Sequence, residues 1–174
     1  MRSTRLIVAL LTVSLLTACG FKLRSSNAVS GRTLPFATIY LSLPAESEFY
    51  AQIRASLEAS ASTRVVSDPV KAEAILTVLN DTNQKSILSL SATGRAREFQ
   101  LVRSFAFKVN TPRQAEYVPE SQISVRRTMT FSDDLVLSKE SEEAALWADI
   151  QKDLVGQLMR RILSSKAKPV ELDK

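Results

Sequence analysis

Few side chains in this 174-residue chain are suited to covalent or acid–base chemistry. The sequence has no His and only one Cys, which excludes a Ser-His-Asp triad, a His-ligated metal, an intrachain disulfide and a multi-cysteine cluster. Its four glycines are too scattered for a phosphate-cradling loop. Asp133 and Asp134 are adjacent carboxylates, but neighbours in a loop point apart and the pattern places no third oxygen ligand beside them. We interpret this pair as a solvated turn, and we expect no catalytic residue, no metal site and no enzymatic activity.

The single cysteine, Cys19, follows a basic start and an apolar stretch of eleven residues, Leu6 to Leu16. As a helix this stretch would be about 16 Å long, about half the thickness of a hydrocarbon core, so it fits a secretory signal peptide rather than a membrane span. The segment Leu16-Thr-Ala-Cys19 resembles a bacterial lipobox, in which the Cys thiol is lipidated and becomes the mature N-terminus. The alternative is an ordinary signal peptide that happens to contain a Cys. We favour a lipoprotein signal peptide over residues 1–18 and lipid attachment at Cys19.

The predicted lipid has two consequences. Several acyl chains, at about 0.8 kcal/mol per buried methylene, hold a protein on a membrane far more firmly than one chain does. Because the lipid consumes the only thiol, we expect no redox chemistry and no cofactor besides the covalent acyl and diacylglycerol lipid on Cys19. Gly20, rather than Asp, follows the Cys, and its resemblance to enterobacterial sorting signals implies the outer membrane.

The charge balance does not indicate a nucleic-acid partner. The whole chain has a net charge of +5, and removal of Arg2 and Arg5 with the signal peptide leaves 21 basic residues against 18 acidic ones. No cluster of Lys and Arg and no RNA-binding aromatic motif accompanies this small excess.

The hydrophobic pattern divides the mature chain into a lipidated tether over residues 19–36, one α+β domain over residues 37–165 and a flexible tail over residues 166–174. Alternating residues predict strands over 37–43, 72–79, 98–109 and 122–131, and apolar stripes predict helices over 46–61 and from 139 or 140 to 163. Residues 80–83 are either a turn or a bulge within one long bent strand that continues to residue 90. Gly94 marks a hairpin turn over residues 92–95.

These elements predict a two-layer sandwich, with two helices packed on one face of a mainly antiparallel sheet of about four strands. Trp147 belongs to the apolar stripe of the last helix, so we expect it in the core. Arg103 and Arg127 fall on the apolar side of their strands, where an unpaired charge is costly. Each must find a partner or reach an edge. The alternatives are snorkelling at the end of the sheet, a basic stripe that faces a partner, or strand parity altered by a bulge.

Four stretches together resemble the family of lipopolysaccharide-assembly lipoproteins (LptE): Cys19-Gly-Phe-Lys-Leu-Arg24, Gly94-Arg-Ala-Arg-Glu-Phe-Gln-Leu101, Arg126-Arg-x-x-x-Phe131, and Leu135-Val-Leu-Ser-Lys139-Glu with the acidic helix that follows. The resemblance covers nearly the whole mature chain, through the order and spacing of these motifs. It implies a non-catalytic plug inside a large outer-membrane β-barrel (LptD), needed for the assembly of that barrel. The family also implies that the plug binds lipopolysaccharide. The domain would then lie on the periplasmic side and inside the barrel lumen.

The resemblance also implies where lipopolysaccharide would bind. Lys139 aligns with a basic residue that the family uses for this ligand, and a cation pairs well with its phosphates and acidic sugars. The family's other contacting Arg precedes the hairpin glycine, where this chain has Ala92, so Arg95 or Arg97 would supply that charge. The alternative interpretation of Lys139 is a solvated side chain near a helix start. The rival function is that of an auxiliary lipoprotein of an ABC-type lipid transporter with no barrel partner.

Overall fold

A computed structural model of the chain describes residues 34–60, 63–132 and 136–165, which all lie in one compact unit, Arg32–Lys174. The predicted signal peptide, Cys19, most of the predicted tether, the Asp133–Asp134 pair and the predicted tail lie outside the described residues. Leu34 and Phe36, at the end of the predicted tether, are buried in the hydrophobic core. The packed domain therefore includes Leu34 and Phe36.

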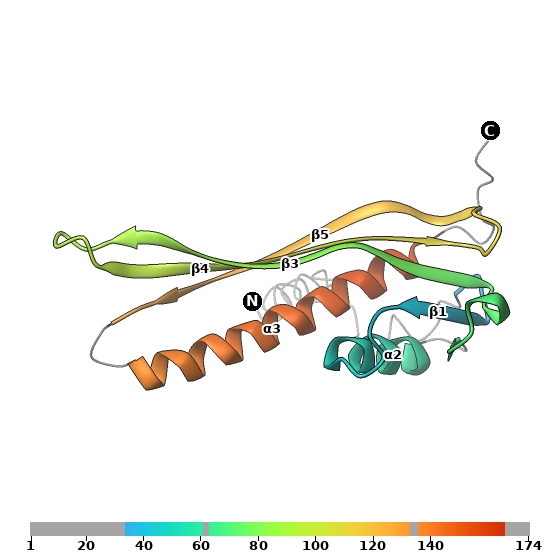
Figure 1. Cartoon of the computed structure of the whole chain (residues 1–174), viewed down its shortest axis with the longest axis horizontal. Helices are drawn as coiled ribbons and strands as arrows, with labels where there is room; N and C mark the ends of the chain where they lie inside the picture. The colour runs from blue at the N-terminus through green and yellow to red at the C-terminus, as the bar shows by residue number, and fades with distance from the viewer. Residues whose placement is uncertain (1–33, 61–62, 133–135, 166–174) are drawn as a thin grey trace, which may run out of the picture. The chain divides into compact units, whose positions relative to one another are not determined.

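A single five-stranded sheet forms one layer of this unit (Figure 1). Its order is β2-β1-β3-β4-β5, with the bounds β1 Thr38–Ser42, β2 Arg64–Val66, β3 Ala74–Leu90, β4 Ala96–Asn110 and β5 Glu116–Thr130. β1 runs parallel to both β2 and β3, whereas β3, β4 and β5 are antiparallel. The α+β prediction is confirmed, but the sheet has five strands and is mixed. The three residues of β2 are too few to show a period, which is why the sequence pattern missed this strand.

Two helices, α2 Glu48–Ser60 and α3 Val136–Leu163, cover the same face of the sheet (Figure 1). A short 3-10 helix, η2 Pro69–Lys71, leads into β3. α2 begins at Glu48 because the Ser47 hydroxyl accepts a hydrogen bond from the Tyr50 amide at 3.1 Å, which satisfies a free amide of the first turn. α2 also supplies the crossover that the parallel pairing of β1 and β2 requires.

The predicted apolar faces meet between the two layers and form one core. α2 contributes its stripe of Phe49, Ile53 and Leu57, all buried. The largest fully buried side chains of the sheet and α3 are Ile39, Leu41, Leu76, Leu101, Phe105, Phe107, Ile123, Ile150, Leu154 and Leu158. Trp147 is only partly buried and packs against the edge of this core.

β3 is one continuous strand of 17 residues, which confirms the long bent strand and rules out the turn over residues 80–83. Its register with β4 shifts between Val78 and Asn80, so Leu79 is an extra residue in the ladder. Before the bulge, Leu76 pairs with Val109, and both side chains are buried beneath the helices. After it, Asp81 pairs with Phe105 and Lys85 with Leu101. The bulge therefore moves the odd-numbered residues of β3 to the face that the helices cover.

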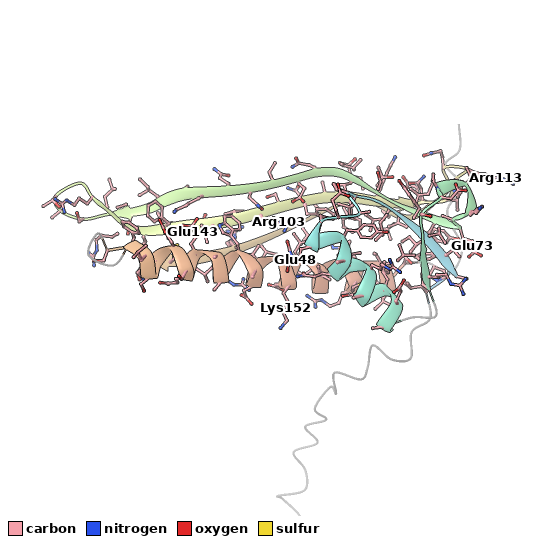
Figure 2. The ribbon with its side chains drawn as sticks, turned by 60° about the horizontal axis from the view of Figure 1, so that its bottom comes forward. Glu48, Glu73, Arg103, Arg113, Glu143 and Lys152 are labelled. Atoms are coloured by element: carbon pink, nitrogen blue, oxygen red, sulfur yellow. The ribbon has the colours of Figure 1, made fainter. Side chains whose placement is uncertain are left out.

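The bulge in β3 brings Asp81 to the side of the sheet on which Arg103 lies. Only 8% of the residue is exposed. Its Nε and Nη2 atoms donate to the two carboxylate oxygens of Asp81 at 2.9 and 2.8 Å, and Nη1 donates to the Oε1 of Gln151 in α3 at 2.9 Å. The guanidinium carbon also lies 4.3 Å from the centre of the Phe49 ring. Figure 2 shows Arg103 between the sheet and the helices.

Arg127 also finds its partners within the chain. Its guanidinium donates to Asp149 at 2.9 Å and to Asp153 at 3.3 Å, both on α3. The register of β4 and β5 is unbroken from Glu98 to Phe107. A bulge in β4 or β5 therefore does not explain why the two arginines lie on the apolar side of their strands. A basic stripe directed at an external partner does not explain it either, because both arginines have partners within the chain. Arg103 bonds to Asp81 and Gln151, and Arg127 bonds to Asp149 and Asp153.

The first half of α3 is held to the sheet by polar contacts and by the partly buried Leu146 and Trp147. Its buried residues all lie from Ile150 onward, among the side chains that the structure describes. Further toward the helix start, Lys85 Nζ lies 2.6 Å from the Oε2 of Glu143, whose other oxygen accepts a hydrogen bond from the Trp147 indole at 3.3 Å. The hydrogen bond from Lys85 lowers the pKa of Glu143 below its ordinary value of 4.5, while partial burial acts in the opposite direction and Trp147 lowers it further.

We expect Asp81→Ala to lower the free energy of unfolding by about 3 kcal/mol, because it leaves the buried Arg103 guanidinium without its counter-charge. Urea denaturation followed by circular dichroism measures this loss. Asp149→Ala is the matched control, since it removes a carboxylate from Arg127 at a more exposed position, and its expected cost is below about 1 kcal/mol. Equal losses in the two variants would contradict the role assigned to the burial of Arg103.

The lowered pKa of Glu143 predicts a pH-dependent contribution to stability. The unfolded chain binds this proton at a higher pH than the folded one, so the stabilisation is complete above pH 4.5 and is lost as the pH falls through the lower folded pKa. Glu143→Gln should therefore be less stable than the unsubstituted protein at pH 7, and the difference should narrow in acid. Glu140→Gln, an exposed carboxylate in the same helix, serves as the control. A difference that does not change with pH, measured by urea denaturation from pH 3 to 7, would refute this assignment.

Candidate functional site

The hairpin between β3 and β4 has a tightly bonded turn over Ser91–Arg95. The Ser91 amide donates to the Arg95 carbonyl at 2.7 Å, and the Ser91 hydroxyl accepts from the Arg95 amide at 3.1 Å. Gly94 has a φ of +79°, a left-handed conformation that a residue with a Cβ rarely adopts. A Cβ built at Gly94 would meet no atom within 4 Å, so the backbone conformation alone explains the glycine. The predicted hairpin is confirmed.

Arg95 and Arg97 flank Ala96, the cross-strand partner of Leu90, and both arginines are exposed. The Arg97 carbonyl accepts a hydrogen bond from the Phe131 amide at 2.7 Å, which ties the end of β5 to this hairpin. Phe131 in turn contacts Phe99 edge-on, with 5.3 Å between the ring centroids. The backbone around Arg97 is thus fixed by neighbouring strands, while its side chain reaches solvent.

Lys139 lies in the first turns of α3, close to the same end of the sheet. Its Nζ atom donates to the Oε2 of Glu142 at 2.7 Å and to the Thr130 hydroxyl at 3.2 Å, and only 14% of its side chain is exposed. Thr130 directly precedes Phe131, the residue bonded to Arg97. The structure therefore brings all three predicted residues to one end of the sheet, which we call the distal end (Figure 1). Lys139 is not the solvated side chain of the alternative interpretation, because Glu142 already neutralises its charge.

Sequence reasoning missed a second feature of the distal end. Four large aliphatic side chains are more than half exposed there: Ile87, Leu88 and Leu90 of β3, and Leu137 at the start of α3. The sequence Ser-Ile-Leu-Ser-Leu is apolar but does not alternate, and an apolar stretch of this kind is expected to be at least partly buried. No local signal shows that the buried residues of α3 begin only at Ile150, among the side chains that the structure describes, and that these aliphatic groups stay exposed.

Two hollows lie away from the distal end. One, of about 700 Å³, runs between α2 and α3 and is lined by small and polar side chains that include Ala55, Ala148 and Gly156. The other, of about 460 Å³, lies between the start of β5 and the end of α3 and includes Tyr117 and Arg161. Burial, and secondarily the Glu73 carboxylate, raises the pKa of the Tyr117 hydroxyl, which keeps that phenol neutral.

The distal end offers charge and apolar surface rather than reactive groups. Guanidinium and ammonium groups form strong hydrogen bonds with phosphates and carboxylates, so the chemistry of Arg95, Arg97 and Lys139 is the recognition of an anion. Within residues 34–60, 63–132 and 136–165, no three His, Cys, Asp or Glu side chains are placed to hold a metal ion. Over the same part of the chain, no helix has the length and apolar content to cross a membrane.

Comparison with known proteins agrees with this fold. The family model described as LptE, lipopolysaccharide-assembly, matches residues 36–162. No curated protein matches the sequence significantly. Among solved structures, an uncharacterised lipoprotein B of Nitrosomonas europaea is 34% identical, with 83% of this chain and 91% of that chain covered and a TM-score of 0.69. The rare lipoprotein B of Shewanella oneidensis is 25% identical, with 72% and 90% covered and a TM-score of 0.54.

A minor lipoprotein of Acinetobacter baumannii, 20% identical with 74% and 92% covered, shares the fold at a TM-score of 0.61. The family match spans the two-layer sandwich from its first buried aromatic residue, Phe36, to the last buried residue of α3, Ile162. It agrees with the close likeness to the Nitrosomonas protein over most of both chains. The chain therefore belongs to the LptE family of lipopolysaccharide-assembly lipoproteins.

Proposed function

We propose that this chain plugs the LptD outer-membrane β-barrel, helps to assemble it, and binds lipopolysaccharide at its distal end. Membership of the family gives it a role in lipopolysaccharide assembly, as a non-catalytic envelope lipoprotein. The observation that carries the binding proposal is the convergence of Arg95, Arg97 and Lys139 from two segments that are far apart in the sequence.

Phosphates are the ligand groups that these side chains fit. The two arginines present planar donor groups to solvent, which suits bidentate contact with a phosphate of the lipid or inner core. Lys139 contributes where a phosphate replaces the carboxylate of Glu142. Neither bond making nor electron transfer enters this role, in keeping with the expected absence of catalytic residues and of any cofactor besides lipid.

The proposal also includes the anchor. Cys19 carries the acyl and diacylglycerol lipid that holds the protein in the outer membrane, and the domain lies on the periplasmic side and within the barrel lumen. The partners are then the barrel, lipopolysaccharide and membrane lipid, with no nucleic acid.

Replacing Arg95, Arg97 and Lys139 together by Glu should weaken lipopolysaccharide binding at least about tenfold, because three attractive charges become repulsive. Single exposed pairs are worth at most about 1 kcal/mol, so single variants are expected to show little. Binding should also weaken as salt rises, since about 0.1 M salt screens exposed charges over about 10 Å. A titration at low and moderate salt measures both effects.

The matched control changes the net charge equally at other places, through Lys108→Glu, Arg113→Glu and Lys152→Glu. Arg113 lies at the opposite end of the sheet from the β3–β4 hairpin (Figure 2). Circular dichroism checks that both triple variants fold. Unchanged affinity in a folded distal-end variant, or an equal loss in the control, would remove this binding site from the proposal.

Cys19→Ser tests the anchor and the barrel in one fractionation experiment. With a cleavable signal, the variant should remain with outer membranes while the barrel is present, because the barrel still holds it. It should become soluble when the barrel is depleted, because it lacks the lipid that is proposed to anchor it. Sedimentation with membranes after depletion would contradict the lipid anchor. Solubility in the presence of the barrel would contradict the plug and favour the ABC-transporter role.

A further inference from the structure

The distal end carries an exposed aliphatic surface that folding does not explain. Six large hydrophobic side chains are exposed in the described part of the chain, and four of them lie at this end. Their exposed fractions are 56% for Ile87, 51% for Leu88, 57% for Leu90 and 81% for Leu137. We call these four residues the distal apolar patch. Exposed apolar side chains gathered at one end of a folded protein mark a place where something binds.

The covering helix explains why the patch remains open. The buried residues of α3 begin at Ile150, and closer to the hairpin α3 meets the sheet through Lys85–Glu143. Figure 2 shows Glu143 between Arg103 and the hairpin. β3 nevertheless continues past Lys85 with three aliphatic residues. The first of these three, Ile87, pairs with Phe99 of β4, and Lys85 Nζ lies 4.5 Å from the centre of the Phe99 ring.

Exposed cations lie directly beside these aliphatic groups. Leu90 pairs across the hairpin with Ala96, whose two neighbours are Arg95 and Arg97. Cross-strand partners lie about 5 Å apart, so the aliphatic residue and the two basic residues belong to the same end of one hairpin. A ligand that fits this surface combines apolar chains with anionic groups attached close to them.

The composition of the patch favours a lipid over a protein partner. Among the residues that carry the binding energy of protein interfaces, Trp, Tyr and Arg are enriched and Leu is under-represented, so at this end only the two arginines fit a protein partner. The patch contains only Ile and Leu, with no exposed aromatic residue among its members. Branched aliphatic side chains instead fit the flexible methylene chains of a lipid, at about 0.8 kcal/mol for each methylene removed from water.

We propose that the distal apolar patch binds acyl chains of the same lipopolysaccharide molecule whose phosphates Arg95 and Arg97 bind. This inference rests on the proposed function and adds to it that the protein recognises the lipid portion of its ligand. A short aliphatic surface beside two guanidiniums distinguishes a phosphorylated glycolipid from the same phosphorylated sugars without acyl chains.

The test compares intact lipopolysaccharide, kept below its aggregation concentration, with the same material after alkaline removal of its acyl chains. The protein is the exported full chain with Cys19→Ser. It should bind the intact ligand at least about tenfold more tightly, since covering the exposed half of even one leucine is worth about that factor. Replacing all four patch residues by Ser should abolish this preference and leave the affinity for the deacylated ligand unchanged. Val70→Ser with Leu79→Ser, two exposed aliphatic residues outside the patch, should preserve the preference.

The outcomes separate this inference from the proposed function. Equal affinity of the protein for both ligands, with the charge-reversal variant still defective, would overturn the acyl-chain site and leave the phosphate site intact. An undiminished preference in the folded patch variant would also overturn the inference. So would a patch variant that keeps the preference but no longer associates with the barrel, because the patch would then be a barrel contact.

Discussion

The bulge at Leu79 is the constraint on which the distal half of this fold depends. Up to Val78, β3 places apolar side chains such as Leu76 beneath the helices. One extra residue then brings Asp81 and Lys85 to that same face. Without it, both charges would point to the open face of the sheet, and Arg103 would be buried without a carboxylate, which is one of the most costly arrangements in a protein interior. A single inserted residue therefore makes a buried arginine compatible with the core.

The same change divides the sandwich into two differently stabilised halves. Around Phe105, Phe107 and Leu154 the layers are joined by apolar packing. Further out, Lys85–Glu143 and the contacts of Arg127 join them beside the buried Met129. Ion pairs fix the position of α3 but remove little apolar surface from water, and partly exposed pairs contribute little free energy each. The distal half should therefore open locally more easily than the core. Its aliphatic residues remain uncovered for the same physical reason.

The strongly periodic parts of the sequence predicted their elements well. The alternation through Phe105, Phe107 and Val109 defined β4, and the four-residue spacing of Phe49, Ile53 and Leu57 defined α2. The parallel strand β2 was missed because three residues carry no measurable period. The partner of Arg103 could not be predicted from the sequence either. Asp81 lies 22 residues away, and the face of the sheet to which it points depends on a bulge that only the register with β4 reveals. The sequence indicated that this charge needed a partner, but could not identify it.

The distal end combines a rigid backbone with side chains on which the core does not depend. Turn hydrogen bonds at Ser91 and the Phe131–Arg97 bond hold the hairpin, so the exposed arginines can meet a ligand without any rearrangement of buried groups. Lys139 differs, because a cation in the first turns of a helix is disfavoured by the helix dipole and Glu142 compensates for it. Its bond to Thr130 also fastens the start of α3 to the end of β5. A phosphate must compete with Glu142 for Lys139, only 14% of whose side chain is exposed, whereas Arg95 and Arg97 are exposed residues. Lys139 therefore holds the helix beside the hairpin, through its bonds to Thr130 and Glu142.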